Sequence, residues 1–101
     1  MRFILKFSVP TEAGNEAIRD REFPAKLQQW LSDINAEAAY FAPVNGRRGG
    51  YIVVNLDDAS KMPAFTMPLF LWLNAEVEWI PVMLPEDLAK VDFEGAIKKW
   101  G

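Results

Sequence analysis

The sequence predicts a single α+β domain, spanning residues 1–101, in which helices cover one face of a small antiparallel sheet. Short segments that alternate apolar and polar residues recur along the chain, which is typical of half-buried strands. Between them, apolar residues are spaced as on one face of a helix. The length of 101 residues and the 50% hydrophobic content suit one domain with its own core.

The first strand is expected at residues 2–9, where the side chains alternate with a period of two. A helical region follows and ends near Asn35, and Thr11 or Asn15 can cap its start. Pro24 interrupts the helical pattern because proline lacks an amide hydrogen. We therefore expect two helical segments or one kinked helix.

Residues 38–44 and 51–56 are predicted to form two strands joined by the loop NGRRGG, in which Asn-Gly is a strong hairpin signal. Two interpretations of Arg47 and Arg48 remain. As a solvated hairpin tip, their charge would discourage edge-to-edge aggregation. As an anion clamp, they would bind a carboxylate or phosphate together with free amides of the loop. We favour the solvated tip because charged side chains on loops are usually hydrated.

A short helix is expected to start near Ala59, capped by Asp57 or Asp58. Pro68 is expected to break this helix and restart it. Residues 75–82 alternate again and are predicted to form a fourth strand.

A last helix is expected to open at Pro85 and to run toward Trp100. The predicted order is β-α-β-β-α-β-α, and its first six elements match the split-βαβ, ferredoxin-like plan. Right-handed crossovers then give a four-stranded antiparallel sheet in the order 4-1-3-2, with both main helices on one face.

The uncovered face of this sheet is predicted to be mixed, with apolar side chains beside a few charged ones. A sheet face of this kind favours packing against a second copy about a two-fold axis, so we expect a homodimer. Lys6 can lie beside Glu76 or Glu78 because their strands are neighbours in the predicted order. These three residues are either a structural ion pair at a subunit interface or a catalytic pair. The apolar members of this face are Ile4, Tyr40, Tyr51, Val53 and Ile80.

Composition excludes several kinds of chemistry. The chain has neither cysteine nor histidine, so disulfides, thiolate nucleophiles, Ser-His-Asp triads and haem held by His or Cys are ruled out. We expect no metal site and no cofactor, and acid–base work would fall to Glu, Asp, Lys or Tyr. A net charge of −3 argues against nucleic acid as a partner. No apolar stretch has membrane-spanning length, and the N-terminus is predicted to be a strand rather than a signal peptide, so we expect a cytoplasmic protein.

The stretch NGRRGGYIVVNLDDASKMPAFTMPLFLWLNAEVEWIPVMLPEDL resembles a group of short uncharacterised bacterial proteins in the dimeric α+β barrel superfamily. Within it, MPLFLWLNAEVEWIPV is similar to the part of muconolactone isomerases that has a Pro-Leu-Phe helix turn before an acidic last strand. The resemblance implies a dimeric barrel fold. It does not choose an activity, because this fold serves many reactions. No catalytic residue of the isomerases is matched position by position.

Two classes of function follow. The first is a protein that binds, or isomerises by cofactor-independent proton transfer, a small apolar or aromatic carboxylate, with Lys6, Glu76 or Glu78 moving the proton. Its pocket would lie between sheet and helices, lined by Trp30, Tyr40, Trp72 and Trp79. The second is a non-catalytic homo-oligomeric module. A cavity of a few hundred Å³ with convergent polar groups would favour the first class, and a fully packed interface the second.

Overall fold

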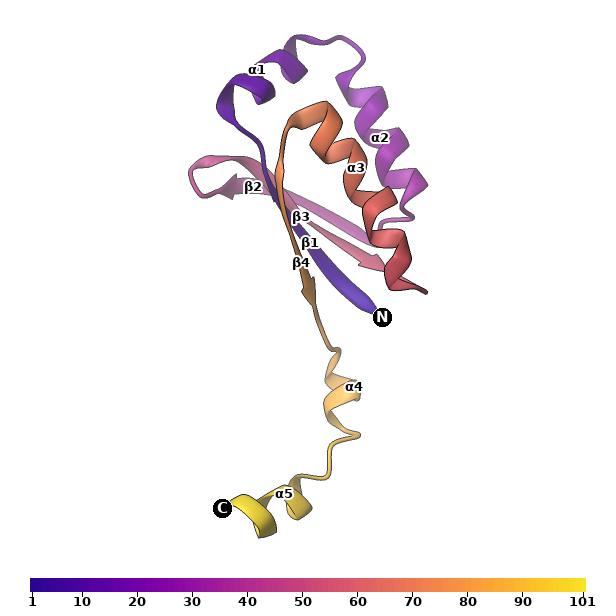
Figure 1. Ribbon diagram of the computed structural model, residues 1–101, viewed down its shortest axis with the longest axis vertical. Helices are drawn as coiled ribbons and strands as arrows, with labels where there is room; N and C mark the ends of the chain where they lie inside the picture. Colours follow the sequence, from indigo (N-terminus) through magenta and orange to yellow (C-terminus); the bar gives the residue numbers. More distant parts are fainter.

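The computed structural model describes residues 1–101 and shows an α+β domain followed by a C-terminal arm (Figure 1). The domain comprises β1 (Arg2–Ser8), α1 (Thr11–Arg19), α2 (Phe23–Asp33), β2 (Ala38–Val44), β3 (Arg47–Asn55), the 3₁₀ helix η1 (Ala59–Lys61), α3 (Met62–Leu73) and β4 (Glu76–Pro81). The arm, residues 82–101, contains α4 (Pro85–Leu88) and α5 (Phe93–Trp100). No helix has both the length and the apolar character needed to cross a membrane.

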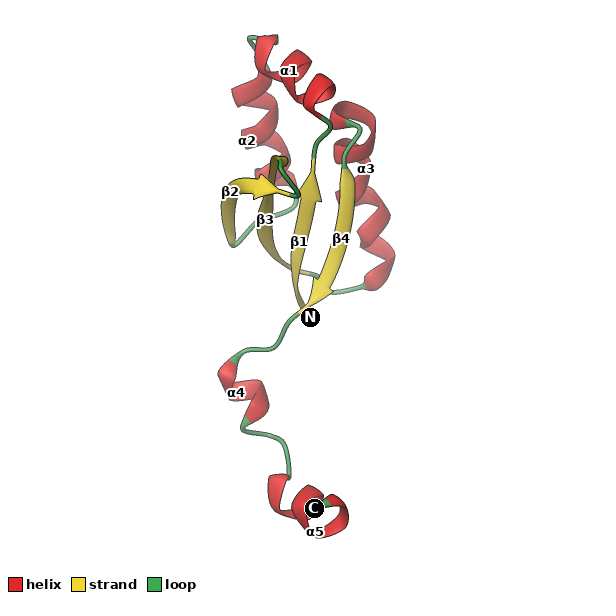
Figure 2. Ribbon diagram, turned by 90° about the vertical axis from the view of Figure 1, so that its left-hand side faces the viewer, coloured by secondary structure: helices red, strands yellow, loops and turns green.

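The four strands form one antiparallel sheet in the order β2-β3-β1-β4. This is the predicted order 4-1-3-2 read from the other edge, so that prediction is confirmed. The helices of the domain lie behind the sheet in Figure 2, and the opposite face is left open. We call the two sides the helix-covered face and the open face.

The main hydrophobic cluster lies on the helix-covered face, whereas buried Val44 lies on the open face at the end of β2. Thirteen buried residues form a single cluster, and none of them belongs to the arm. Leu5, Ile52 and Leu69 are fully buried. Leu5 of β1 lies opposite Ile52 on one side and Trp79 on the other. Strand alternation therefore places Lys6, the next residue, on the open face between Tyr51 and Glu78.

The β2–β3 hairpin is tighter than the sequence suggested. Its turn consists of Asn45 and Gly46 alone, both with positive φ (54° and 75°), as a two-residue turn of this type requires. β3 therefore begins at Arg47, four residues before the predicted start, and neither arginine lies at the tip. Gly49 has no positive φ. A side chain there would instead collide with the carbonyl of Phe7.

The prolines act differently from expectation. Pro24 lies in the first turn of α2, where a missing amide hydrogen costs nothing, and the chain breaks before it, at Asp20–Glu22. Pro68 lies inside α3, which continues from Met62 to Leu73, so the predicted break at this residue is wrong. Burial of Leu69 and Leu73 against the sheet outweighs the one hydrogen bond that Pro68 removes.

The predicted helix caps are partly correct. Asp58 caps η1, accepting a hydrogen bond from the backbone N–H of Ser60 at 2.9 Å. Helix α1 begins at Thr11, but its cap position is Pro10 and no side chain caps it. The single C-terminal helix expected from Pro85 is instead two short helices, because Asp92 interrupts the chain and caps α5.

Candidate functional site

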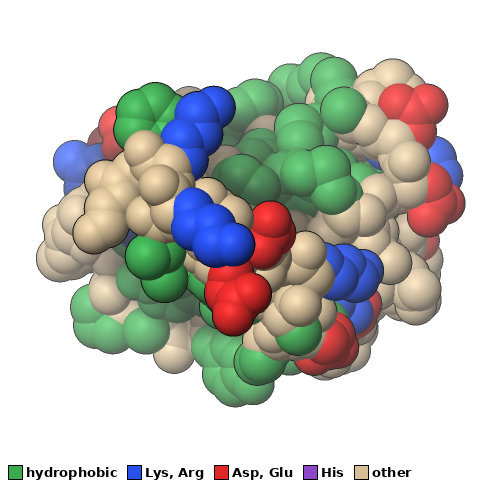
Figure 3. Space-filling model, turned by 90° about the horizontal axis from the view of Figure 1, so that it is seen from below, with side chains coloured by type: hydrophobic (Ala, Val, Ile, Leu, Met, Phe, Trp, Pro, Cys, Tyr) green, Lys and Arg blue, Asp and Glu red, His purple; other side chains and the backbone are tan.

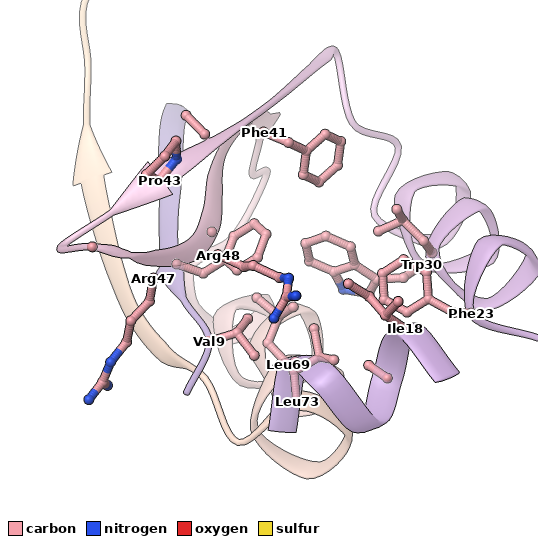
Figure 4. Close-up of a pocket in the computed structure, with 17 residues that line it drawn as sticks. Val9, Ile18, Phe23, Trp30, Phe41, Pro43, Arg47, Arg48, Leu69 and Leu73 are labelled. Carbon is pink, nitrogen blue, oxygen red and sulfur yellow. The ribbon is translucent and has the colours of Figure 1, made fainter. Parts of the chain in front are cut away.

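A cavity of about 530 Å³ lies between the β2–β3 hairpin and helices α1 and α2. Its walls are mainly apolar, formed among others by Phe7, Val9, Phe23, Trp30, Phe41 and Leu69 (Figure 4). This volume lies within the range of small-molecule sites. The helix–sheet interface is therefore not fully packed. The cavity has the volume that we expected of a small-molecule binder, but its lining is mainly apolar and lacks the expected set of convergent polar groups.

Trp30 forms the fixed part of this cavity. It is buried, and its indole Nε1 donates a hydrogen bond to the backbone carbonyl of Phe65 at 3.1 Å. Its ring meets the ring of Phe7 edge-on, with centroids 6.4 Å apart. With its one polar atom satisfied and its ring held by Phe7, Trp30 presents a preorganised aromatic surface to the cavity.

Arg48 is the polar group at the mouth of the cavity. Its neighbour in β3, Arg47, points away from the cavity, while Arg48 extends across it (Figure 4), as alternation along a strand requires. Arg48 Nη1 donates to Asn15 Oδ1 of α1 at 2.9 Å. Arg48 belongs to none of the ion pairs of the chain. Its charge is thus matched only by a neutral amide.

Gly14 gives the guanidinium its space. A Cβ at this position would lie 3.1 Å from Arg48 Nη1, closer than most such contacts allow. The backbone of Arg48 is fixed as well, since its carbonyl accepts a hydrogen bond from Val9 at 2.8 Å. β1, β3 and α1 together therefore position this one charge beside apolar walls.

The four aromatic residues predicted to line one pocket do not meet. Only Trp30 lines the cavity. Tyr40 lies opposite Tyr51 on the open face. Trp72 of α3 packs against Phe23 of α2. Trp79 of β4 packs against Phe3 and donates a hydrogen bond to Thr66.

Lys6, Glu76 and Glu78 do come together, on the open face. They line a shallow depression of about 250 Å³. Lys6 lies directly opposite Glu78, and Ser8 lies opposite Glu76. Lys6 forms no ion pair with either carboxylate. The expected neighbourhood is thus present, on the side of the sheet away from the cavity.

The clearest ion pair lies at one end of the open face. Arg2 Nε and Nη2 donate to the two carboxylate oxygens of Glu37 at 2.8 and 3.0 Å. The hydrogen bond from Arg2 lowers the pKa of Glu37 below its ordinary value. This pair ties β1 to the start of β2 and lines neither the cavity nor the depression. No group of three acidic side chains is placed to bind a metal ion.

The sequence did not single out Asn15 or Gly14 as site residues. A two-residue Asn-Gly turn, had it been assigned, would have put Arg47 and Arg48 in the strand and therefore on opposite faces. Their contact with α1 depends on tertiary packing. Comparisons of the chain with protein-family profiles, with curated proteins and with solved structures find no match.

Proposed function

We propose that this chain binds a small aromatic or otherwise apolar carboxylate, with the ring in the cavity and the carboxylate on Arg48. The observation that carries the proposal is a guanidinium without an acidic partner at the mouth of an apolar cavity of about 530 Å³. A planar guanidinium suits a planar carboxylate, because it donates two parallel hydrogen bonds.

The two parts of the ligand would contribute differently. Burial of an aromatic ring contributes about 25 cal/mol per Å² of apolar surface removed from water. A hydrogen bond to a charged group contributes about 1.5–3 kcal/mol, and the exposure of Arg48 at the mouth favours the low end. The walls would thus supply most of the affinity, and Arg48 would select carboxylates over neutral analogues.

Binding rather than isomerisation is the activity that the cavity supports. Its lining residues include two arginines but no carboxylate, amine or phenol to accept a proton. Proton transfer by Lys6, Glu76 or Glu78 is a proposal for the open face, where a second copy would have to enclose the shallow depression. Such a face-to-face homodimer, arranged as a dimeric α+β barrel, is also part of our proposal.

Calorimetric titration with benzoate and phenylacetate, each beside its neutral amide, tests the binding proposal. We expect the wild-type protein to bind the carboxylates and to bind the amides about tenfold or more weakly, in line with the hydrogen-bond contribution above. Arg48→Gln should remove the preference for the carboxylate, because a neutral amide replaces the guanidinium.

Arg47→Gln is the matched control. It removes the same charge one residue away, where the side chain points out of the cavity (Figure 4), so it should leave affinity within about twofold of wild type. Equal losses in both variants would show a general charge effect. Absence of binding by every carboxylate and amide would favour the non-catalytic homo-oligomeric module instead.

A further inference from the structure

The arm exposes an apolar face that the domain does not cover. In α5, the side chains of Phe93, Ile97 and Trp100 are 56%, 66% and 80% exposed. Their spacing of four and three residues puts them on one side of the helix, away from Lys98. The ammonium of Lys99 lies 5.4 Å from the centre of the Trp100 ring and borders this apolar side. An eight-residue helix is marginal in water on its own, so this face needs a partner to keep α5 folded.

The path of the chain takes the arm away from its own domain. The N–H of Val82 donates to the carbonyl of Arg2 at 3.1 Å, which continues the β1–β4 ladder past the end of β4. The chain leaves along the strand direction, on the open-face side of the sheet (Figure 1). Its longest dimension reaches 59 Å, and the radius of gyration is 17.2 Å, against about 13 Å for a compact chain of this length.

Viewed from the end of the arm, apolar side chains lie at the surface among charged ones (Figure 3). The domain has an uncovered apolar edge as well. β2 is an edge strand, and its residues Tyr40 and Phe41 are 63% and 55% exposed. An exposed apolar edge strand tends to pair with other chains unless something covers it.

We propose that two copies of this chain exchange arms, with the apolar face of α5 in one copy packing on the β2 edge of the other. The inference rests on the proposed homodimer and names the segment that secures it. A copy docked on the open face lies on the side toward which the arm emerges. Two-fold symmetry makes the exchange reciprocal, so each copy gives one arm and receives one.

The area involved is adequate for a stable dimer. Phe93 and Trp100 alone offer on the order of 300–500 Å² per arm, and the reciprocal exchange doubles this. The surfaces that receive the arms add a similar amount. A specific interface buries about 1,200–2,000 Å² in total, so the arms account for much of it before any contact between the sheets.

Sedimentation velocity tests the role of the arm. The triple variant Phe93→Ser, Ile97→Ser, Trp100→Ser should raise the dimer dissociation constant at least tenfold. The control Glu94→Ser, Lys98→Ser changes the opposite side of the same helix, keeps the net charge and should leave the dissociation constant unchanged. Because all these side chains are exposed within one chain, neither variant should unfold the domain, and circular dichroism at low concentration verifies this.

A disulfide test identifies the receiving edge, since the wild-type chain has no cysteine. Single variants Tyr40→Cys and Trp100→Cys, mixed and oxidised, should give a disulfide-linked heterodimer. Leu71→Cys, exposed on α3 over the helix-covered face, should not pair with Trp100→Cys.

The outcomes separate the two proposals. A triple variant that dimerises as well as wild type would overturn arm exchange and leave the homodimer standing. A monomeric wild-type protein would overturn both. A double variant Tyr40→Cys, Trp100→Cys that closes its disulfide within one chain, with no intermolecular product, would show that the arm folds back on its own domain and would also refute exchange.

Discussion

The two faces of the sheet differ: one has an enclosed cavity, and the other has the side chains able to transfer protons. The helix-covered face carries the main hydrophobic cluster and an apolar cavity with the guanidinium of Arg48 across its mouth. The open face carries Lys6 beside Glu78, two groups able to move protons, in a depression open to solvent. Catalysis generally needs reactive groups and exclusion of water in one place. One copy of this chain keeps them on opposite sides of a strand, so it is better suited to bind than to transform.

Substitutions of Leu5 and Ile4 should show the largest difference between the two faces, because these residues are adjacent in β1 and point to opposite faces. Leu5 is fully buried, while Ile4 is half-buried on the open face. Leu5→Ala should lower the free energy of unfolding by about 2–5 kcal/mol, and Ile4→Ala by about 1 kcal/mol or less in dilute monomer. Urea denaturation checks both. Equal losses would contradict a main hydrophobic cluster on one face.

The buried hydroxyls of Thr66, on the helix-covered side, and Ser8, on the open face, should differ less in their contribution to stability. Thr66 Oγ1 accepts a hydrogen bond from Trp79 Nε1 at 2.8 Å under the helices. Thr66→Val should cost about 1–3 kcal/mol because it leaves the half-buried indole N–H of Trp79 unpaired. Ser8 Oγ donates to the Val44 carbonyl at 3.1 Å, and Ser8→Ala should cost about 0.5–1.5 kcal/mol. Thermal unfolding measures both, and the reverse order would contradict the contrast.

The smallest effect concerns the Arg2–Glu37 pair. Because Arg2 lowers the pKa of Glu37 in the folded state, the stabilisation is present at neutral pH. It is lost as pH falls from the ordinary glutamate value of 4.5 through the lowered folded pKa. The free energy of unfolding, measured from pH 7 to pH 3, should therefore fall less steeply in Glu37→Gln than in the wild-type protein. An unchanged dependence of the free energy of unfolding on pH would show that the Arg2–Glu37 pair does not stabilise the fold.

Much of the fold was predictable because the strand alternation and helical spacing are local signals. The orientation of the β2 side chains was less certain, since Tyr40 was assigned both to the open face and to the pocket. AAYFAPV is apolar throughout, so only its register with β3 decides that Tyr40 faces outward and that Phe41 lines the cavity. The link between Arg48 and Asn15 joins residues 33 positions apart and depends on how α1 crosses the hairpin. The proximity of Lys6 to Glu78 was predictable, since it follows from strand order alone.

The central claim is that a carboxylate occupies the cavity beside Arg48. The chain has four tryptophans, of which only Trp30 lines the cavity, so their indole N–H resonances report ligand position directly. In a nitrogen–proton correlation spectrum, assigned with single Trp→Phe variants, titration with phenylacetate should shift the Trp30 resonance most. In Arg48→Gln, the same shift of the Trp30 resonance should need a much higher concentration of phenylacetate. A Trp30 resonance that stays fixed while phenylacetate binds, or that shifts equally in both proteins, would contradict the account.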